Sequence, residues 1–136
     1  MRLIVLGEAR LRPPYEDDVA HYVKLLSRHA RLELVWARDA ATLARRVPDG
    51  AFVSLLTAAG QSYDSLAFSA FLEERRRAGR DVAFVIGGPF GAPALARVDH
   101  RLSLGAMTLA HQLAWVVLLE QLYRAHKILA REPYHY

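Results

Sequence analysis

Short apolar segments typical of buried strands alternate with helical patterns along the whole chain, and this alternation most restricts how it can fold. The segments expected to form strands lie at residues 2–7, 32–37, 50–56, 81–88 and 101–105. The segments with helical patterns lie at residues 15–30, 39–47, 65–79, 92–98 and 109–129. Strands that alternate with helices form a parallel sheet covered by helices. The sequence therefore predicts the α/β class.

Length and composition are those of one globular domain. The chain has 136 residues, of which 53% are hydrophobic and 24% charged, enough to build one core. No repeat, low-complexity segment or linker interrupts it, so we expect a single domain over residues 1–136. The absence of cysteine excludes a disulfide framework and a zinc–thiolate site, and it is compatible with the reducing cytoplasm.

No apolar run in the sequence is long enough to act as a membrane segment. The N-terminal stretch MRLIVLGEARLRPP contains a run too short for a signal peptide and far too short to span a bilayer. We therefore expect a cytoplasmic protein with no membrane partner. Its 18 Lys and Arg residues against 14 Asp and Glu residues permit RNA or another anionic partner.

Two residues have the types that end or begin helices. Asp39 precedes the helical pattern at 39–47 in the way of an N-cap, whose side chain accepts a hydrogen bond from the first turn. Gly79 follows the pattern at 65–79, where a glycine can take the left-handed conformation.

The last helical pattern carries more apolar surface than one core contact needs. Its apolar side chains cover more than one face, and they include Leu113, Val116, Val117, Leu118, Leu119 and Leu122. A surface helix needs an apolar stripe of only about 100°. This helix is therefore either central to the fold or packed against a second subunit, and we favour a symmetric homodimer.

A glycine-rich turn, GGPFG at residues 87–91, follows the predicted fourth strand. Ligands of open α/β sheets bind beyond the carboxyl ends of the strands, so this turn is a candidate site. It matches neither of the glycine patterns that hold phosphates. It is either a tight turn or a stretch of bare backbone against which an adenine or a ribose could lie.

The other side chains with catalytic or metal-binding chemistry form no known pattern. His126 and His135 do not have the spacing of a helical ligand pair, and no carboxylates cluster around them, so no metal site is expected. No nucleophile motif is present either. Residue patterns alone thus predict an α/β domain with a ligand site at the glycine turn, and they favour a dimer.

Four motifs, in this order and spacing, carry a resemblance that goes further. They are FVIGGPFG at 84–91, LSLGAMTLAH at 102–111, LLEQLYRAHKI at 118–128 and PYH at 133–135. Together they resemble the RlmH family of SPOUT-class methyltransferases, which act on a pseudouridine in large-subunit (23S) ribosomal RNA. The resemblance covers essentially the whole chain. It implies a deep trefoil knot in the C-terminal half, loops that bind S-adenosylmethionine, and a homodimer that completes the active site.

The resemblance also implies roles for individual residues. The cofactor-binding residues would be Leu55, Gly87, Gly88, Leu104, Gly105, Ala106, Met107, Thr108 and Leu109. The catalytic residues would be Tyr134, His135 and Arg124, which would orient the base as its N3 atom loses a proton. No metal is needed, and the partner would be the assembled ribosome rather than free RNA.

The chain departs from the family pattern at several positions. Leu56 stands where the family usually has Asp, and Gly105 where it commonly has Ser. Trp115 replaces an Arg, and Tyr136 replaces a basic residue after PYH. Two basic residues are thus lost near the expected RNA-binding face. This loss supports an alternative, a ribosome- or RNA-binding SPOUT protein with weak or lost methyltransferase activity.

Overall fold

Five parallel strands form the centre of the protein, which we describe from a computed structural model over residues 1–88 and 93–134. The strands are β1 (Arg2–Glu8), β2 (Arg31–Ala37), β3 (Phe52–Ser62), β4 (Val82–Ile86) and β5 (His100–Ser103). Their order across the sheet is β2-β1-β4-β3-β5, and every neighbouring pair is parallel. The predicted α/β class with a parallel sheet is confirmed.

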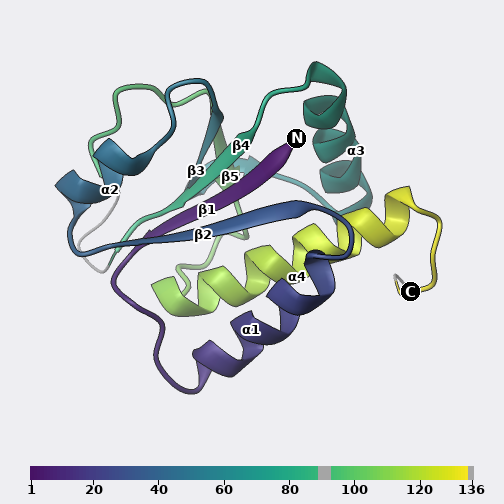
Figure 1. Ribbon diagram of the computed structural model, residues 1–136, viewed down its shortest axis with the longest axis horizontal. Helices are drawn as coiled ribbons and strands as arrows, with labels where there is room; N and C mark the ends of the chain where they lie inside the picture. Colours follow the sequence, from purple (N-terminus) through teal and green to yellow (C-terminus); the bar gives the residue numbers. More distant parts are fainter. Residues whose placement is uncertain (89–92, 135–136) are drawn as a thin grey trace.

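Four helices cover the two faces of the sheet unequally (Figure 1). The helices are α1 (Tyr15–Leu26), α2 (Ala40–Arg46), α3 (Ser65–Ala78) and α4 (His111–Leu129). Side chains of α1, α3 and α4 share one core cluster, whereas Leu43 of α2 belongs to the cluster on the opposite face. The sheet is thus buried on both sides, as a parallel sheet must be.

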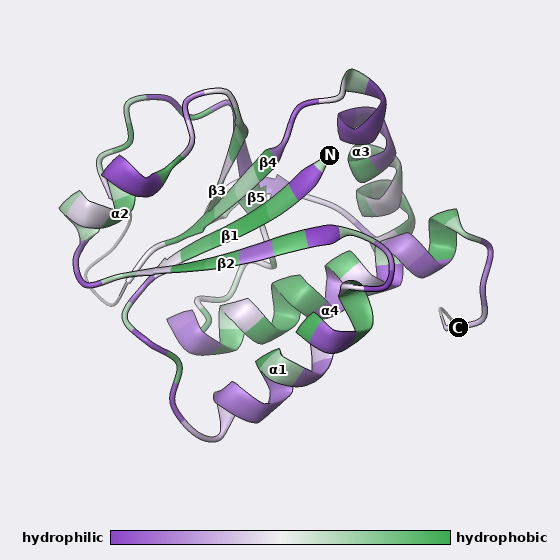
Figure 2. Ribbon diagram, in the orientation of Figure 1, coloured by the Kyte–Doolittle hydropathy of each residue, from purple (hydrophilic) through white to green (hydrophobic). Residues whose placement is uncertain are grey.

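The two central strands β1 and β4 show why their sequences are apolar throughout. Leu3 and Val5 pack on the face covered by α4, and Ile4 and Leu6 pack on the face covered by α2. All five residues of β4 are buried. Figure 2 shows these strands as hydrophobic bands, while α1 exposes a hydrophilic outer side. Apolar and polar residues do not alternate along these strands, because both of their faces are buried.

Helix α4 is central to the fold. Trp115, Leu118, Leu119 and Leu122 are each at most 1% exposed, and the helix packs against both α1 and α3. A second strip of apolar side chains on α4 remains half-buried, made by Leu113, Val116, Val117 and Ile128. A central place in the fold therefore explains the apolar side chains on the buried face of α4. The half-buried strip remains available for a second subunit.

Both predicted helix boundaries are confirmed. The Asp39 side chain accepts a hydrogen bond of 2.7 Å from the Thr42 backbone N–H, which caps α2. Gly79 ends α3 with a φ of 77°, in the left-handed region. The first helix is shorter than expected, because α1 ends at Leu26 rather than at residue 30.

Strand β3 is longer than the sequence predicts, since it continues to Ser62 through residues that were expected to form a loop. Leu56 and Gln61 both pair with Leu102 of β5, so the residues between them form a bulge. At Gly60 an added Cβ would lie 2.7 Å from the carbonyl carbon of Arg101. The extension therefore depends on a close contact between two backbones, which local sequence preference does not encode.

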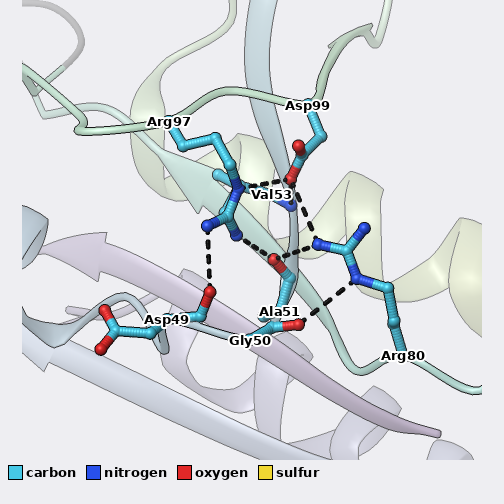
Figure 3. Close-up of polar contacts among 7 residues, drawn as sticks. All are labelled: Asp49, Gly50, Ala51, Val53, Arg80, Arg97 and Asp99. Carbon is cyan, nitrogen blue, oxygen red and sulfur yellow. Dashed lines mark hydrogen bonds and ion pairs between the residues drawn. The ribbon is translucent and has the colours of Figure 1, made fainter.

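The short helix expected at residues 92–98 is not formed over its described part, residues 93–98. Figure 3 shows the reason: side chains tie this segment to the start of β3. The Arg97 guanidinium donates to the carbonyl oxygens of Asp49, at 2.9 Å, and Ala51. Asp99 accepts from the Val53 N–H at 2.8 Å and from Arg97 at 3.0 Å. These long-range bonds hold the segment extended on its way into β5.

Candidate functional site

The carboxyl ends of β4 and β5 and the middle of β3 surround a cavity of about 360 Å³, which we call the strand-end cavity. It is lined by Leu56, Thr57, Ala58, Ile86, Gly87, Gly88, Leu102, Leu104, Gly105, Met107, Thr108, Leu109, His111 and Ala114. Because all the strands are parallel, their carboxyl ends lie at one edge of the sheet, and the loops that follow them meet there.

Most of the predicted cofactor-binding residues lie in this cavity. Seven of the nine line it, namely Gly87, Gly88, Leu104, Gly105, Met107, Thr108 and Leu109. Leu55 instead packs in the core cluster on the α2 face, beside Val85, and is 7% exposed. Ala106 is not among the lining residues either.

The next residue, Leu56, lines the cavity, because successive side chains of a strand point to opposite faces. Thr57, Ala58, His111 and Ala114 also line it and were not predicted. Strand alternation counted from buried Leu55 was the one signal that could have identified Leu56.

The walls of the strand-end cavity are almost uncharged. Among its described lining residues there is no Asp, Glu, Lys or Arg, and His111 is the single titratable side chain. Apolar side chains and backbone groups predominate. Such walls suit a planar, weakly polar group that is held by backbone hydrogen bonds rather than by ion pairs.

Gly88 and Gly105 of the cavity are glycines for different structural reasons. An added Cβ at Gly88 would overlap the carboxylate of Glu8 and lie 3.1 Å from its Cβ, so the end of β1 approaches this backbone closely. Gly105 has a φ of 142°, which other residues rarely adopt, and its N–H donates to the Ser103 hydroxyl at 3.1 Å. The glycine turn therefore makes room for Glu8, and its remaining residues 89–91 lie outside the described residues.

The predicted catalytic residues Arg124 and Tyr134 lie together at the far end of α4. The Arg124 guanidinium carbon is 4.7 Å from the centre of the Tyr134 ring, and its Nη2 donates to Glu120 at 2.7 Å. The Tyr134 ring also packs edge-on against Tyr123, with 4.8 Å between centroids. We call Glu120, Arg124 and Tyr134 the tail group. His135 lies outside the described residues.

The environment of Tyr134 favours its protonated form. Burial raises the pKa of Tyr134 to about 12, aided by the nearby Glu120 carboxylate and Tyr22 and opposed by Arg124. The hydrogen bond to Glu120 raises the pKa of Arg124 as well. At neutral pH this group presents a neutral phenol beside a permanently charged guanidinium.

The strand-end cavity and the tail group are separated along α4. His111 lines the cavity and Arg124 lies thirteen residues later, which corresponds to about 20 Å along a helix. The two parts of the predicted active site therefore do not touch within one chain.

Trp115, which stands where an Arg was expected, is part of the core. It is 1% exposed, and its ring stacks on Trp36 with 4.0 Å between centroids. The position does not face solvent, so the replacement is a change of packing rather than the loss of a surface charge. Tyr136 lies outside the described residues.

Residues 1–88 and 93–134 contain neither a metal-binding cluster nor a helix that could cross a membrane. No group of three or more His, Cys, Asp or Glu side chains in these ranges could hold a metal ion. None of the helices in the described part of the chain has the length and apolar character needed to cross a membrane.

Known proteins are similar to this chain over most or all of its length. A family described as "Predicted SPOUT methyltransferase" matches residues 1–135. A protein of Solidesulfovibrio magneticus named "Ribosomal RNA large subunit methyltransferase H" is 42% identical, with 100% of this chain and 98% of that protein covered. Proteins of the same name from Gemmatimonas aurantiaca (89% and 85% covered) and Ruminiclostridium cellulolyticum (99% and 99%) are 41% and 36% identical.

Proposed function

Since the chain belongs to the SPOUT methyltransferases, and among them to the RlmH family, we propose that it methylates N3 of a pseudouridine in large-subunit ribosomal RNA, with S-adenosylmethionine as methyl donor. The protein is a ribosomal RNA methyltransferase by its relationship to proteins of that name. What we propose beyond this relationship is the methylated atom N3, the pseudouridine base and the donor S-adenosylmethionine.

One observation carries the proposal of the donor site, namely the uncharged strand-end cavity. Seven of the nine residues that the resemblance implies converge on it from separate loops. Its walls fit S-adenosylmethionine, because an adenine ring can lie against Leu56, Met107 and Leu109 and bond to backbone groups near Gly87 and Leu104. When bound, S-adenosylmethionine supplies an electrophilic methyl group on a positively charged sulfur.

The tail group would act on the RNA base. Transfer forms the bond between N3 and the methyl carbon, breaks the bond between that carbon and sulfur, and releases the N3 proton. Arg124 is a permanent cation that favours the anionic form of the base. Tyr134, with a pKa raised to about 12 by burial, remains a hydrogen-bond donor at neutral pH and would orient a carbonyl oxygen of the ring. We expect His135 to assist in the same place.

A homodimer is the second part of the proposal. The half-buried strip on α4, made by Leu113, Val116, Val117 and Ile128, is an apolar surface that a second copy could cover. The separation between the strand-end cavity and the tail group also favours an active site that is completed by a second subunit. The expected state in solution is therefore a dimer, which sedimentation would measure directly.

The trefoil knot and the cytoplasmic location are proposed on the same grounds. Strand β3 lies between β4 and β5, which follow it in sequence, so the connection from β4 to β5 passes across β3. This order is compatible with the knot that the family resemblance implies. A ribosomal substrate would place the protein in the cytoplasm.

The alternative of RNA binding without transfer loses one of its supports. It rested partly on the lost charge at position 115, and Trp115 is buried against Trp36. Leu56, which lines the strand-end cavity, remains the described departure closest to the donor site.

Methyl transfer decides between these functions. Ribosomes that lack the modification and free large-subunit RNA are each incubated with the protein and S-adenosylmethionine carrying a labelled methyl group. Label on one pseudouridine of the ribosome supports the proposal, and absence of label from both acceptors, with donor binding measured separately, supports the alternative. A chain truncated after Arg131, which lacks Tyr134 and His135, should bind the donor but not transfer the methyl group.

A further inference from the structure

A second cavity of about 390 Å³ lies beside the strand-end cavity and has no role in the function proposed so far. We call it the Tyr63 cavity. It is lined by Ser62, Tyr63, Asp64, Ser65, Phe68, Leu102, Ser103, Leu104, Gly105, Val117 and Gln121. Leu102, Leu104 and Gly105 line both cavities, so the two cavities share part of their walls.

A buried chain of hydrogen bonds fixes one wall of this cavity. The Tyr63 hydroxyl lies 2.9 Å from Nε2 of His100, and Nδ1 of the same ring lies 2.8 Å from the hydroxyl of Ser54, which is fully buried. The His100 ring also stacks on Phe71, with 4.6 Å between centroids. The phenol of Tyr63 is thereby held in one position.

Because the His100 ring is neutral, the Tyr63 hydroxyl can make a hydrogen bond in addition to the one with His100. Burial, assisted by the Arg75 cation, lowers the pKa of His100, so the ring is neutral near pH 7 and carries a single N–H. It can therefore make one donated and one accepted hydrogen bond to its two partners. In either arrangement the Tyr63 hydroxyl retains capacity for another hydrogen bond.

Two other lining residues, Ser65 and Gln121, are connected to the tail group. The Ser65 hydroxyl donates to the side-chain oxygen of Gln121 at 2.8 Å, and Gln121 donates to Glu120 at 3.0 Å. Glu120 accepts from Arg124 at 2.7 Å, and Arg124 lies over Tyr134. A continuous polar chain thus runs from the wall of the Tyr63 cavity to the residues proposed to act on the base.

These positions place the cavity between the two separated parts of the site. Along α4, His111 and Ala114 line the strand-end cavity, Val117 and Gln121 line the Tyr63 cavity, and Arg124 follows one turn later. A group held in the Tyr63 cavity would therefore lie next to the methyl donor.

We propose that the Tyr63 cavity receives the pyrimidine ring of the nucleotide that is methylated. The inference rests on the proposed function, and it assigns the base-binding subsite of that function. Phe68 and Leu104 offer apolar surface for the faces of the ring. Tyr63, Ser65 and Gln121 offer donors and acceptors for its carbonyl and imide edge. Stacking on apolar side chains with hydrogen bonds at the edge is how enzymes hold an extruded base.

The test compares Ser62→Trp with Gln61→Trp. Both residues are exposed and adjacent on β3, but only Ser62 is among the residues that line the cavity. Each full-length variant is assayed for methyl transfer to unmodified ribosomes, for S-adenosylmethionine affinity by calorimetry, and for mass in solution. S62W should lower kcat/KM for ribosomes by at least about 100-fold, because the base can no longer enter, with donor affinity unchanged. Q61W should transfer at the wild-type rate.

Tyr63→Phe provides a second variant in case the bulky side chain prevents folding. Loss of its hydroxyl should lower kcat/KM by about tenfold, with donor affinity and mass in solution unchanged. Wild-type transfer by both S62W and Y63F would overturn the proposal. Loss of donor affinity in S62W would overturn it too, because the cavity would then belong to the donor site. If the wild-type protein itself methylates no RNA, the proposed function fails and the subsite falls with it.

Discussion

The indole rings of Trp36 and Trp115 stack with their centroids 4.0 Å apart and their planes inclined by 28°. Trp36 lies on the edge strand β2 and Trp115 on α4, so the pair joins two elements that are distant in sequence. The Trp115 ring also lies directly over Gly7 of β1, where any added Cβ would overlap it. These contacts make position 115 part of the packing between sheet and helix.

Replacing Trp115 should therefore cost stability rather than RNA affinity. Trp115→Ala should lower the free energy of unfolding by about 3–5 kcal/mol, because it removes a large buried ring. Trp36→Ala should cost less, since Trp36 is only half-buried. Urea unfolding of the two variants measures both values. A loss of less than about 1 kcal/mol in W115A would show that the ring is not a core residue.

Gly60 should be intolerant of a side chain, unlike Gly50. A Cβ at Gly60 would lie 2.7 Å from the Arg101 carbonyl carbon and 2.8 Å from that of Leu102, and neither backbone can move without separating β3 from β5. Gly60→Ala should cost about 1–3 kcal/mol. It should also weaken donor binding, because Leu56, Thr57 and Ala58 line the strand-end cavity just before it.

Gly50→Ala is the matched control for this prediction, because no atom lies within 4 Å of its added Cβ. Unfolding in urea and calorimetry with S-adenosylmethionine compare the two variants. Equal stability of G60A and G50A would contradict the contact between β3 and β5.

Stability should fall as the pH is lowered below about 6.5. Burial lowers the pKa of His100, with Arg75 contributing, and burial also lowers the pKa of His126, with His29 and Arg76 contributing and the Leu122 carbonyl opposing. The unfolded chain then binds more protons than the folded one just below the ordinary histidine pKa of 6.5. The stability is thus fully present above that value and is lost as the pH falls toward the folded pKa.

Urea midpoints from pH 5 to pH 7.5 measure this dependence. His100→Gln and His126→Gln should each flatten it, whereas His21→Gln, at an exposed position, should leave it unchanged. A slope that survives replacement of both half-buried histidines would assign it to other groups.

Tyr134 should keep its proton well above the ordinary range for tyrosine. Burial raises its pKa from 10.0 to about 12, so the folded state retains a proton that the unfolded chain releases. The resulting stability is present below pH 10 and is lost as the pH rises toward 12. Ultraviolet absorbance of the tyrosinate in wild type and Tyr134→Phe isolates this one titration. A difference between them that titrates near 10 would show that Tyr134 is solvated.

Local chemistry explains which features could be predicted from the sequence. Asp39 caps α2 and Gly79 ends α3 through bonds to residues a few positions away, so residue type alone indicates them. The apolar runs of β1 and β4 likewise predicted strands that are buried on both faces. Seven of the nine cofactor-binding residues implied by the family motifs lie together because the strand ends meet at one edge.

Contacts between distant segments explain what could not be predicted. Residues 92–98 suggested a helix, but Arg97 and Asp99 bond instead to the start of β3, more than forty positions earlier. Leu55 was expected to contact the cofactor, and the side of the sheet to which its side chain points depends on the register of β3 with β4. The family pattern suggested a surface charge at position 115, and only the stack with Trp36 reveals that this position is buried.

By itself, the sequence determined the class of fold, the order of its five strands, the family and the loops that surround the strand-end cavity. These follow from hydrophobic periodicity, helix caps and short motifs, which act over a few residues. Only the tertiary structure decided the bulge at Gly60, the burial of Trp115 and the hydrogen bonds that join Ser54, His100 and Tyr63. Such features arise where segments remote in sequence pack together, because burial and hydrogen-bond partners are properties of the assembled core.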